Sequence, residues 1–168
     1  MEIEQAIQTA LQYEERIRDL YIKAMKDAKS DAGRKVFRVL AKEEQIHIDY
    51  LEVRLVEWKK DKKINIEKLQ TLIPSTKEID KEIEKLPTDF GKEQKHLEIT
   101  LLQQALELET ATSNFYKQMS AELKEDAQIM FSNFLKIEEN HRAIVLAEMD
   151  SLNGMGFWLH VREFDLEG

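Results

Sequence analysis

Both prolines of this 168-residue chain, Pro74 and Pro87, lie in one segment, residues 64–91, where the helical spacing of apolar residues is also broken. On either side are long proline-free stretches in which apolar residues recur every three or four positions. This periodicity is typical of amphipathic helices. The chain has only 5 Gly and 2 Pro and 35% charged residues, whereas a sheet protein normally needs more turn residues. The sequence therefore predicts an all-α fold.

Four helices are expected, over about residues 3–29, 32–58, 89–123 and 125–152. KSDAG separates the first two and offers Ser30 or Asp31 as a helix cap, and NGMG stops the last helix. Residues 61–88 or so form a long crossover between the second and third helices, in which short helical turns are expected because structureless loops of that length are unusual. This order predicts a four-helix bundle with one crossover. A single domain would span residues 1–168, and the aromatic tail, residues 154–168, would dock on the bundle or on a second subunit.

Charge and composition exclude several classes of function. A net charge of −8 argues against nucleic acid as a partner. The absence of cysteine excludes thiolate metal sites, iron–sulfur clusters and a cysteine nucleophile. The acidic N-terminus lacks the basic and apolar regions of a signal peptide, and no apolar run approaches the ~18 residues of a membrane span. A cytoplasmic location is therefore expected.

A Glu-x-x-His motif occurs three times, but one copy alone is weak evidence because about one residue in seven is Glu. The second half of the chain echoes the first at an offset of 94–95 residues, and this repeat includes two of the copies. The matched residues are Glu14 with Glu109, Tyr21 with Tyr116, Glu44 with Glu138, and His47 with His141. Glu93 and His96 have no counterpart at that offset and are expected to be exposed.

Helix geometry tests the same residues independently. Glu14 lies about 17 residues before the turn near residue 31, and Glu44 and His47 lie about 13 and 16 after it. In the second half the corresponding separations from the turn near residue 124 are about 15, 14 and 17. At ~1.5 Å rise per residue, all six residues meet at one height in the middle of the bundle. His96 lies ~20 Å from that height and is excluded.

The four carboxylates and two imidazoles also lie on or near the apolar stripes of their helices, whereas Glu15 and Glu107 are more exposed neighbours. Buried like charges cost several kcal/mol each unless they are compensated. Two divalent cations would supply +4 against −4. Oxygen and imidazole ligands without sulfur favour iron or manganese over structural zinc. The sequence predicts two iron ions per chain, or manganese, held by Glu14, Glu44, His47, Glu109, Glu138 and His141.

Residues 5–150 resemble the ferritin-like di-iron carboxylate proteins, in which two helices each give one Glu and two give Glu-x-x-His. The Glu and Tyr seven residues apart in both halves look most like the rubrerythrin, or erythrin, branch. The resemblance implies that Glu44 and Glu138 bridge the metals, that Glu14 and Glu109 are terminal ligands, and that His47 and His141 each cap one metal.

The chain departs from rubrerythrins in two ways. Rubrerythrins carry a rubredoxin domain whose iron is held by four cysteines, and this chain has none. Their seventh ligand, a Glu one turn after the third-helix Glu, is replaced by Thr112, so the remaining ligand set is closer to that of bacterioferritin. Tyr21 and Tyr116 are expected either to pack in the core or to hydrogen-bond a ligand carboxylate; a redox role is a further alternative. Trp158 and His160 are expected to pack rather than to bind metal.

Three functions are compatible with this pattern. The first is a di-iron oxidoreductase that reduces peroxide or dioxygen with electrons from an external carrier such as a rubredoxin-like protein. The second is a ferroxidase that stores iron in a shell of subunits. The third is a helical interaction module without metal. In the first two cases a homodimer or larger homo-oligomer is expected, and the sequence does not decide between iron and manganese or between peroxide and dioxygen.

Overall fold

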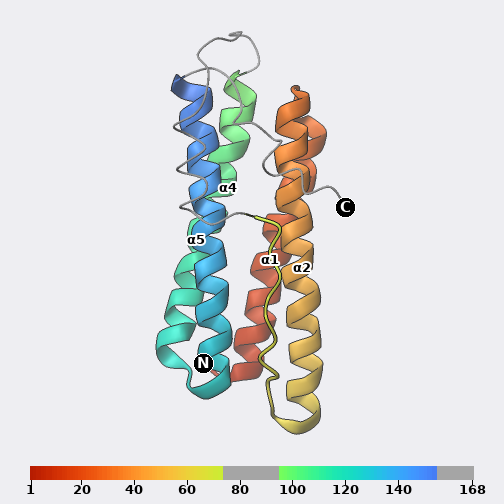
Figure 1. The fold of residues 1–168 in the computed structure, drawn as a ribbon, viewed down its shortest axis with the longest axis vertical. Helices are drawn as coiled ribbons and strands as arrows, with labels where there is room; N and C mark the ends of the chain where they lie inside the picture. Colours follow the sequence, from red (N-terminus) through yellow and green to blue (C-terminus); the bar gives the residue numbers. More distant parts are fainter. Residues whose placement is uncertain (74–94, 155–168) are drawn as a thin grey trace.

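The computed structural model describes residues 1–73 and 95–154, and within these ranges the chain contains four helices and no strand. The helices are α1 (Ile3–Asp27), α2 (Asp31–Asp61), α4 (Lys95–Glu122) and α5 (Glu125–Gly154). They lie side by side as a four-helix bundle, which confirms the predicted fold class (Figure 1). The predicted start of the third helix near residue 89, most of the crossover and almost all of the tail lie outside the described residues.

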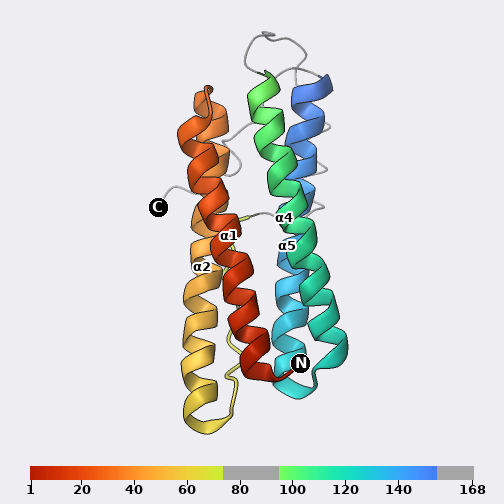
Figure 2. The same ribbon diagram turned by 180° about the vertical axis from the view of Figure 1, so that it is seen from behind.

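The bundle consists of two antiparallel pairs, α1 with α2 and α4 with α5, and α1 also packs against α4 (Figures 1 and 2). The end of α2 and the beginning of α4 lie at opposite ends of the bundle (Figure 1). A bundle with one crossover has the ends of its second and third helices arranged in this way.

The first part of this connection, residues 62–73, contains no helix and runs back along α2. The phenol of Tyr50 donates a hydrogen bond to the carbonyl of Glu67 over 3.2 Å, and the backbone N–H of Leu72 donates to Glu43 over 2.8 Å. In these contacts the later residue of α2 meets the earlier residue of the returning segment, so the segment runs antiparallel to α2. Short helical turns were expected somewhere within residues 64–91; residues 64–73 contain none, and the rest of that segment lies outside the described residues.

Helix ends follow local chemistry. The hydroxyl of Ser30 accepts a hydrogen bond from the N–H of Gly33 over 2.9 Å, so Ser30 is the N-cap of α2. The same hydroxyl donates to Glu98 on α4 over 2.7 Å, which joins the two pairs of helices. At its other end α2 continues three residues beyond the predicted position, through Lys59 and Lys60, and stops where Lys62 takes a left-handed conformation, φ 60°.

Two apolar clusters fill the bundle, one toward each end. The upper cluster includes Ile17, Tyr21, Phe37, Leu40, Leu102 and Val145. The lower cluster includes Ile7, Ala10, Leu51, Tyr116, Phe131 and Phe134. On every helix the residues of one cluster come before, and those of the other after, a buried Glu. The polar residues thus form a layer between two apolar ones.

The helices are amphipathic rather than apolar all round. Each carries charged, exposed side chains on its outer face. Of the helices in the described ranges, none has a stretch long and apolar enough to cross a membrane.

Candidate metal centre

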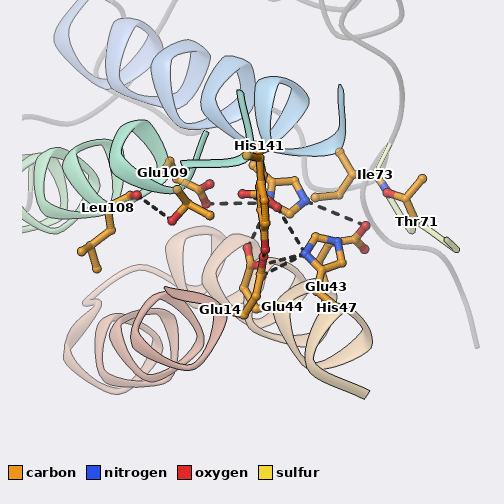
Figure 3. A network of polar contacts seen from close by, with 12 residues as sticks. Glu14, Glu43, Glu44, His47, Thr71, Ile73, Leu108, Glu109 and His141 are labelled. Atoms are coloured by element: carbon orange, nitrogen blue, oxygen red, sulfur yellow. Dashed lines mark hydrogen bonds and ion pairs between the residues drawn. The ribbon is translucent and has the colours of Figure 1, made fainter. Parts of the chain in front are cut away.

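All six residues of the predicted ligand set lie in the polar layer, and each side chain is fully buried. They come from all four helices: Glu14 from α1, Glu44 and His47 from α2, Glu109 from α4, and Glu138 and His141 from α5. Ligand atoms of the two Glu-x-x-His pairs all lie within 4.8 Å of one another. This buried group can hold a metal ion (Figure 3).

Helix geometry produces this convergence. Residues three apart on a helix share a face, so each Glu-x-x-His presents its carboxylate and its imidazole in the same direction. The two helices of each pair turn back on themselves, and their matched lengths bring the paired residues to the same level. The repeat then places a second copy of the arrangement opposite the first.

Glu44 and Glu138 each reach both histidines. The two oxygens of Glu44 lie 3.2 Å from Nδ1 of His47 and 3.0 Å from Nδ1 of His141. The two oxygens of Glu138 lie 3.3 Å and 3.7 Å from the same two nitrogens. Each carboxylate therefore has one oxygen on either side of the centre, the arrangement that a bridging ligand needs.

Glu14 and Glu109 lie on opposite sides. An oxygen of Glu14 is 3.1 Å from Nδ1 of His47, and one of Glu109 is 3.8 Å from Nδ1 of His141. The two imidazole rings are stacked, with centroids 5.2 Å apart and an angle of 3° between their planes. The cluster thus has two similar halves, each with one imidazole, the carboxylate of Glu14 or Glu109, and one oxygen from each of Glu44 and Glu138.

The two tyrosines of the repeat connect the halves. The phenol of Tyr21 on α1 donates a hydrogen bond to Glu109 on α4 over 2.5 Å, and that of Tyr116 on α4 donates to Glu14 on α1. Burial and the adjacent carboxylates raise the pKa of both phenols well above the usual value, so both stay protonated as donors. Two of the alternatives for these residues therefore hold together, because each tyrosine packs in an apolar cluster and also hydrogen-bonds a candidate ligand.

Burial and the close approach of several charges shift the pKa values of the groups in this cluster. Burial, with the nearby charge of Glu138, raises the pKa of Glu109 well above its usual value, and burial raises the pKa of Glu44 to about 7. Burial opposes protonation of His47, but Glu14 and the other carboxylates outweigh it and raise its pKa well above normal. The pKa of His141 is raised in the same way, chiefly by Glu44. The shifts of these four pKa values all favour the protonated forms of Glu44, Glu109, His47 and His141.

Several buried atoms of the cluster make no hydrogen bond within the described part of the chain. They are both oxygens of Glu44 and Glu138, one oxygen of Glu109, Nε2 of His47 and both ring nitrogens of His141. An unsatisfied buried polar group costs about 1–3 kcal/mol. Cations between the carboxylates would satisfy the inward-facing atoms, so the residues present fit a metal centre with oxygen and imidazole ligands.

Glu43 is a buried member of this layer that the sequence prediction left without a role. One of its oxygens lies 3.9 Å from Nε2 of His141, and the other accepts the hydrogen bond from Leu72. The signal was present in the sequence, because Glu43 follows Val36 and Leu40 at helical spacing, on the same stripe as His47. It was missed because Glu44 already accounted for the motif.

The structure describes only some of the remaining residues considered. Glu15, Glu107 and His96 are exposed, as expected, and His96 lies in the first turn of α4. Thr112 is buried, but its hydroxyl donates to the carbonyl of Leu108 over 2.9 Å and is thus committed to its own helix. Glu93, Trp158 and His160 lie outside the described residues.

Comparison of the chain with protein-family models, with curated proteins and with solved structures finds no match in any of the three. Any assignment of function therefore rests on the residues of the site itself.

Proposed function

We propose that this protein is a di-metal carboxylate oxidoreductase of the ferritin-like, rubrerythrin type. It binds two iron ions, or manganese, and reduces peroxide or dioxygen with electrons from a separate carrier. The observation that carries the proposal is the placement of Glu44 and Glu138. Each spans both histidines, with oxygen–nitrogen distances of 3.0–3.7 Å.

This arrangement supports two ions rather than one. A single ion would use only one side of the cluster and would leave the opposite imidazole and terminal carboxylate buried without a cation. Two divalent ions balance the four carboxylates of Glu14, Glu44, Glu109 and Glu138. The site also offers six ligand residues, two imidazoles and four carboxylates. A closed structural zinc site has only four.

When two ferrous ions are bound, they can supply two electrons, one from each ion, to the O–O bond of peroxide or dioxygen. The chain supplies the surroundings. Its ligands are fully buried between two apolar clusters, so bulk water is excluded. Tyr21 and Tyr116 hold the terminal carboxylates in place as protonated donors. Because these 168 residues include no cysteine, they hold no thiolate-bound iron of their own, and the proposal assigns the return to the ferrous state to a separate electron carrier.

The proposal is tested by anaerobic loading with Fe(II), followed by mixing with hydrogen peroxide or dioxygen in turn. We expect two irons per chain, oxidised together, with the absorption and Mössbauer signals of a coupled ferric pair. Glu138→Gln should abolish the coupled signal, whereas Glu139→Gln, which changes an exposed carboxylate next to it, should not. If neither peroxide nor dioxygen oxidised the bound iron, the proposal would be contradicted. Uptake of many irons per chain, which indicates mineral storage, would also contradict it.

A further inference from the structure

The two halves of the centre differ in the residue that faces Nε2 of the histidine, the ring nitrogen on the side away from the candidate metal position. Nε2 of His141 faces the fully buried carboxylate of Glu43 at 3.9 Å (Figure 3). This separation is an ion-pair distance, longer than a hydrogen bond. Neither Nε2 of His141 nor the facing oxygen of Glu43 makes a hydrogen bond within the described residues. Two buried polar atoms, a donor and an acceptor, thus face each other with no other hydrogen-bonding partner.

Within the described residues, no such carboxylate faces Nε2 of His47. Nε2 of His47 is also buried without a hydrogen bond in the described ranges. In the repeat, the residue before Glu138 that corresponds to Glu43 is Ile137. The ring of His47 instead packs edge-on against Phe134, with centroids 5.4 Å apart. The asymmetry is therefore present in the sequence, which has Glu43 in the first half and Ile137 at the matching position of the second.

Glu43 is also held in place from outside. Its second oxygen accepts the backbone N–H of Leu72, over 2.8 Å, from the segment that returns along α2. One oxygen is thus fixed by the fold, and the other is left to face His141. A buried carboxylate kept in this position has a defined partner in the imidazole.

We propose that Glu43 is the outer partner of His141 and makes the two metal positions unequal, so that the position at His141 binds its ion first and more tightly. This inference rests on the proposed function. A ligating imidazole that binds metal through Nδ1 carries its proton on Nε2, and a carboxylate that accepts this proton fixes the tautomer and orients the ring. It also makes the imidazole a stronger donor to the metal. Its negative charge further favours the nearer cation.

The test uses Zn(II) as a diamagnetic probe and the protein labelled with ¹⁵N at histidine. Nitrogen signals of His47 and His141 are assigned in the metal-free protein from the single variants His47→Gln and His141→Gln. In the wild-type protein, the first equivalent of zinc should shift Nδ1 of His141 and the second should shift Nδ1 of His47. This order of filling is read without any change to Glu43.

The Glu43→Gln variant then removes the charge while keeping an amide oxygen at the same place. We expect the affinity of the His141 position to fall about tenfold or more, with loss of the filling order. Glu139→Gln is the matched control, since it removes an exposed carboxylate beside the other Glu-x-x-His and should leave the order unchanged. A carboxylate that only anchored Leu72 would not change which histidine binds first.

Three results would overturn the inference. Simultaneous shifts of both histidines in the wild-type protein, or an unchanged filling order in Glu43→Gln, would overturn it while leaving the di-metal proposal intact. No shift of either histidine at any zinc concentration would overturn both.

Discussion

At Glu138, the two oxygens of a single carboxylate face two different histidines at 3.3 Å and 3.7 Å. The carboxylate is fully buried and lies close to three others, which explains why burial and the charge of Glu14 raise its pKa. In the absence of metal such a buried carboxylate destabilises the folded state. With metal bound, it would be a ligand to both ions and would stabilise that state. Its contribution to stability should therefore change sign with metal.

The variant Glu138→Gln tests this reversal. Because one of four clustered negative charges is removed, the metal-free variant should melt no lower than the metal-free wild-type protein. Its affinity for Mn(II) should fall by about 100-fold or more, since even outer partners of ligands contribute 10–100-fold. Thermal melting with and without Mn(II) measures both effects. A metal-free variant that melts far below wild type, with metal affinity unchanged, would contradict the account; Glu139→Gln should resemble wild type throughout.

The tyrosines give a second test at this scale. Tyr116→Phe removes the donor to Glu14 and leaves a buried carboxylate oxygen without that hydrogen bond. The free energy of unfolding should fall by about 1–3 kcal/mol. Tyr50→Phe is the control, because the phenol of Tyr50 makes a longer bond, 3.2 Å, in a more exposed position, and should cost less. Denaturant unfolding measures both; equal losses would indicate that burial next to Glu14 has no special role.

Some buried residues of the polar layer were predicted from the sequence, and one was not. Glu14 and Glu109 were identified because each lies on an apolar stripe at the height of a Glu-x-x-His, and both are buried where predicted. Glu43 was not identified, although it lies on the same stripe as His47, because Glu44 next to it already accounted for the motif. Its contact with the backbone of Leu72 could not be predicted, because a returning loop leaves no periodic pattern in the sequence.

At the scale of the helices, the positions of the site residues could be predicted mainly from the lengths of the helices. The turns at the ends of the two hairpins set the register, and the register brings six side chains to one level. The short connections were therefore predictable from KSDAG and from the break near residue 124. The path of residues 62–73 was not, because it depends on contacts of their backbone with Glu43, Tyr50 and Arg54 rather than on their own propensity.

Ser30 is the residue on which this register most clearly depends. Its hydroxyl caps α2 through Gly33 and also donates to Glu98 of α4. Ser30→Ala should lower the free energy of unfolding by about 1–2 kcal/mol, the usual loss of an N-cap together with a hydrogen bond. Ser120→Ala, which removes a hydroxyl bonded only to its own helix, is the control and should cost less. A chemical denaturation series compares them, and equal costs would argue against the link between the helix pairs.

At the scale of the whole molecule, proton balance links the centre to pH. In the metal-free state the raised pKa values of His47, His141 and Glu109, and that of Glu44 at about 7, mean that the cluster holds protons near neutrality. Metal binding requires neutral imidazoles and ionised carboxylates, so these protons must leave. Apparent metal affinity should therefore rise as pH increases from about 6 to about 8.

Calorimetric titration of Mn(II) in buffers of different ionisation enthalpy measures the number of protons released. We expect more than one proton per chain at neutral pH, with a release that declines at higher pH. Binding without proton release, or affinity that falls as pH rises, would show that the metal binds elsewhere.

The central claim is that two ions lie between Glu44 and Glu138, one at each histidine. Anomalous X-ray scattering at the iron or manganese edge, from crystals of the loaded protein, tests it most directly. The account predicts two peaks in the polar layer, both within ligand distance of the two bridging carboxylates, one next to His47 and the other next to His141. A single peak, no peak, or peaks at exposed carboxylates outside this layer would contradict it.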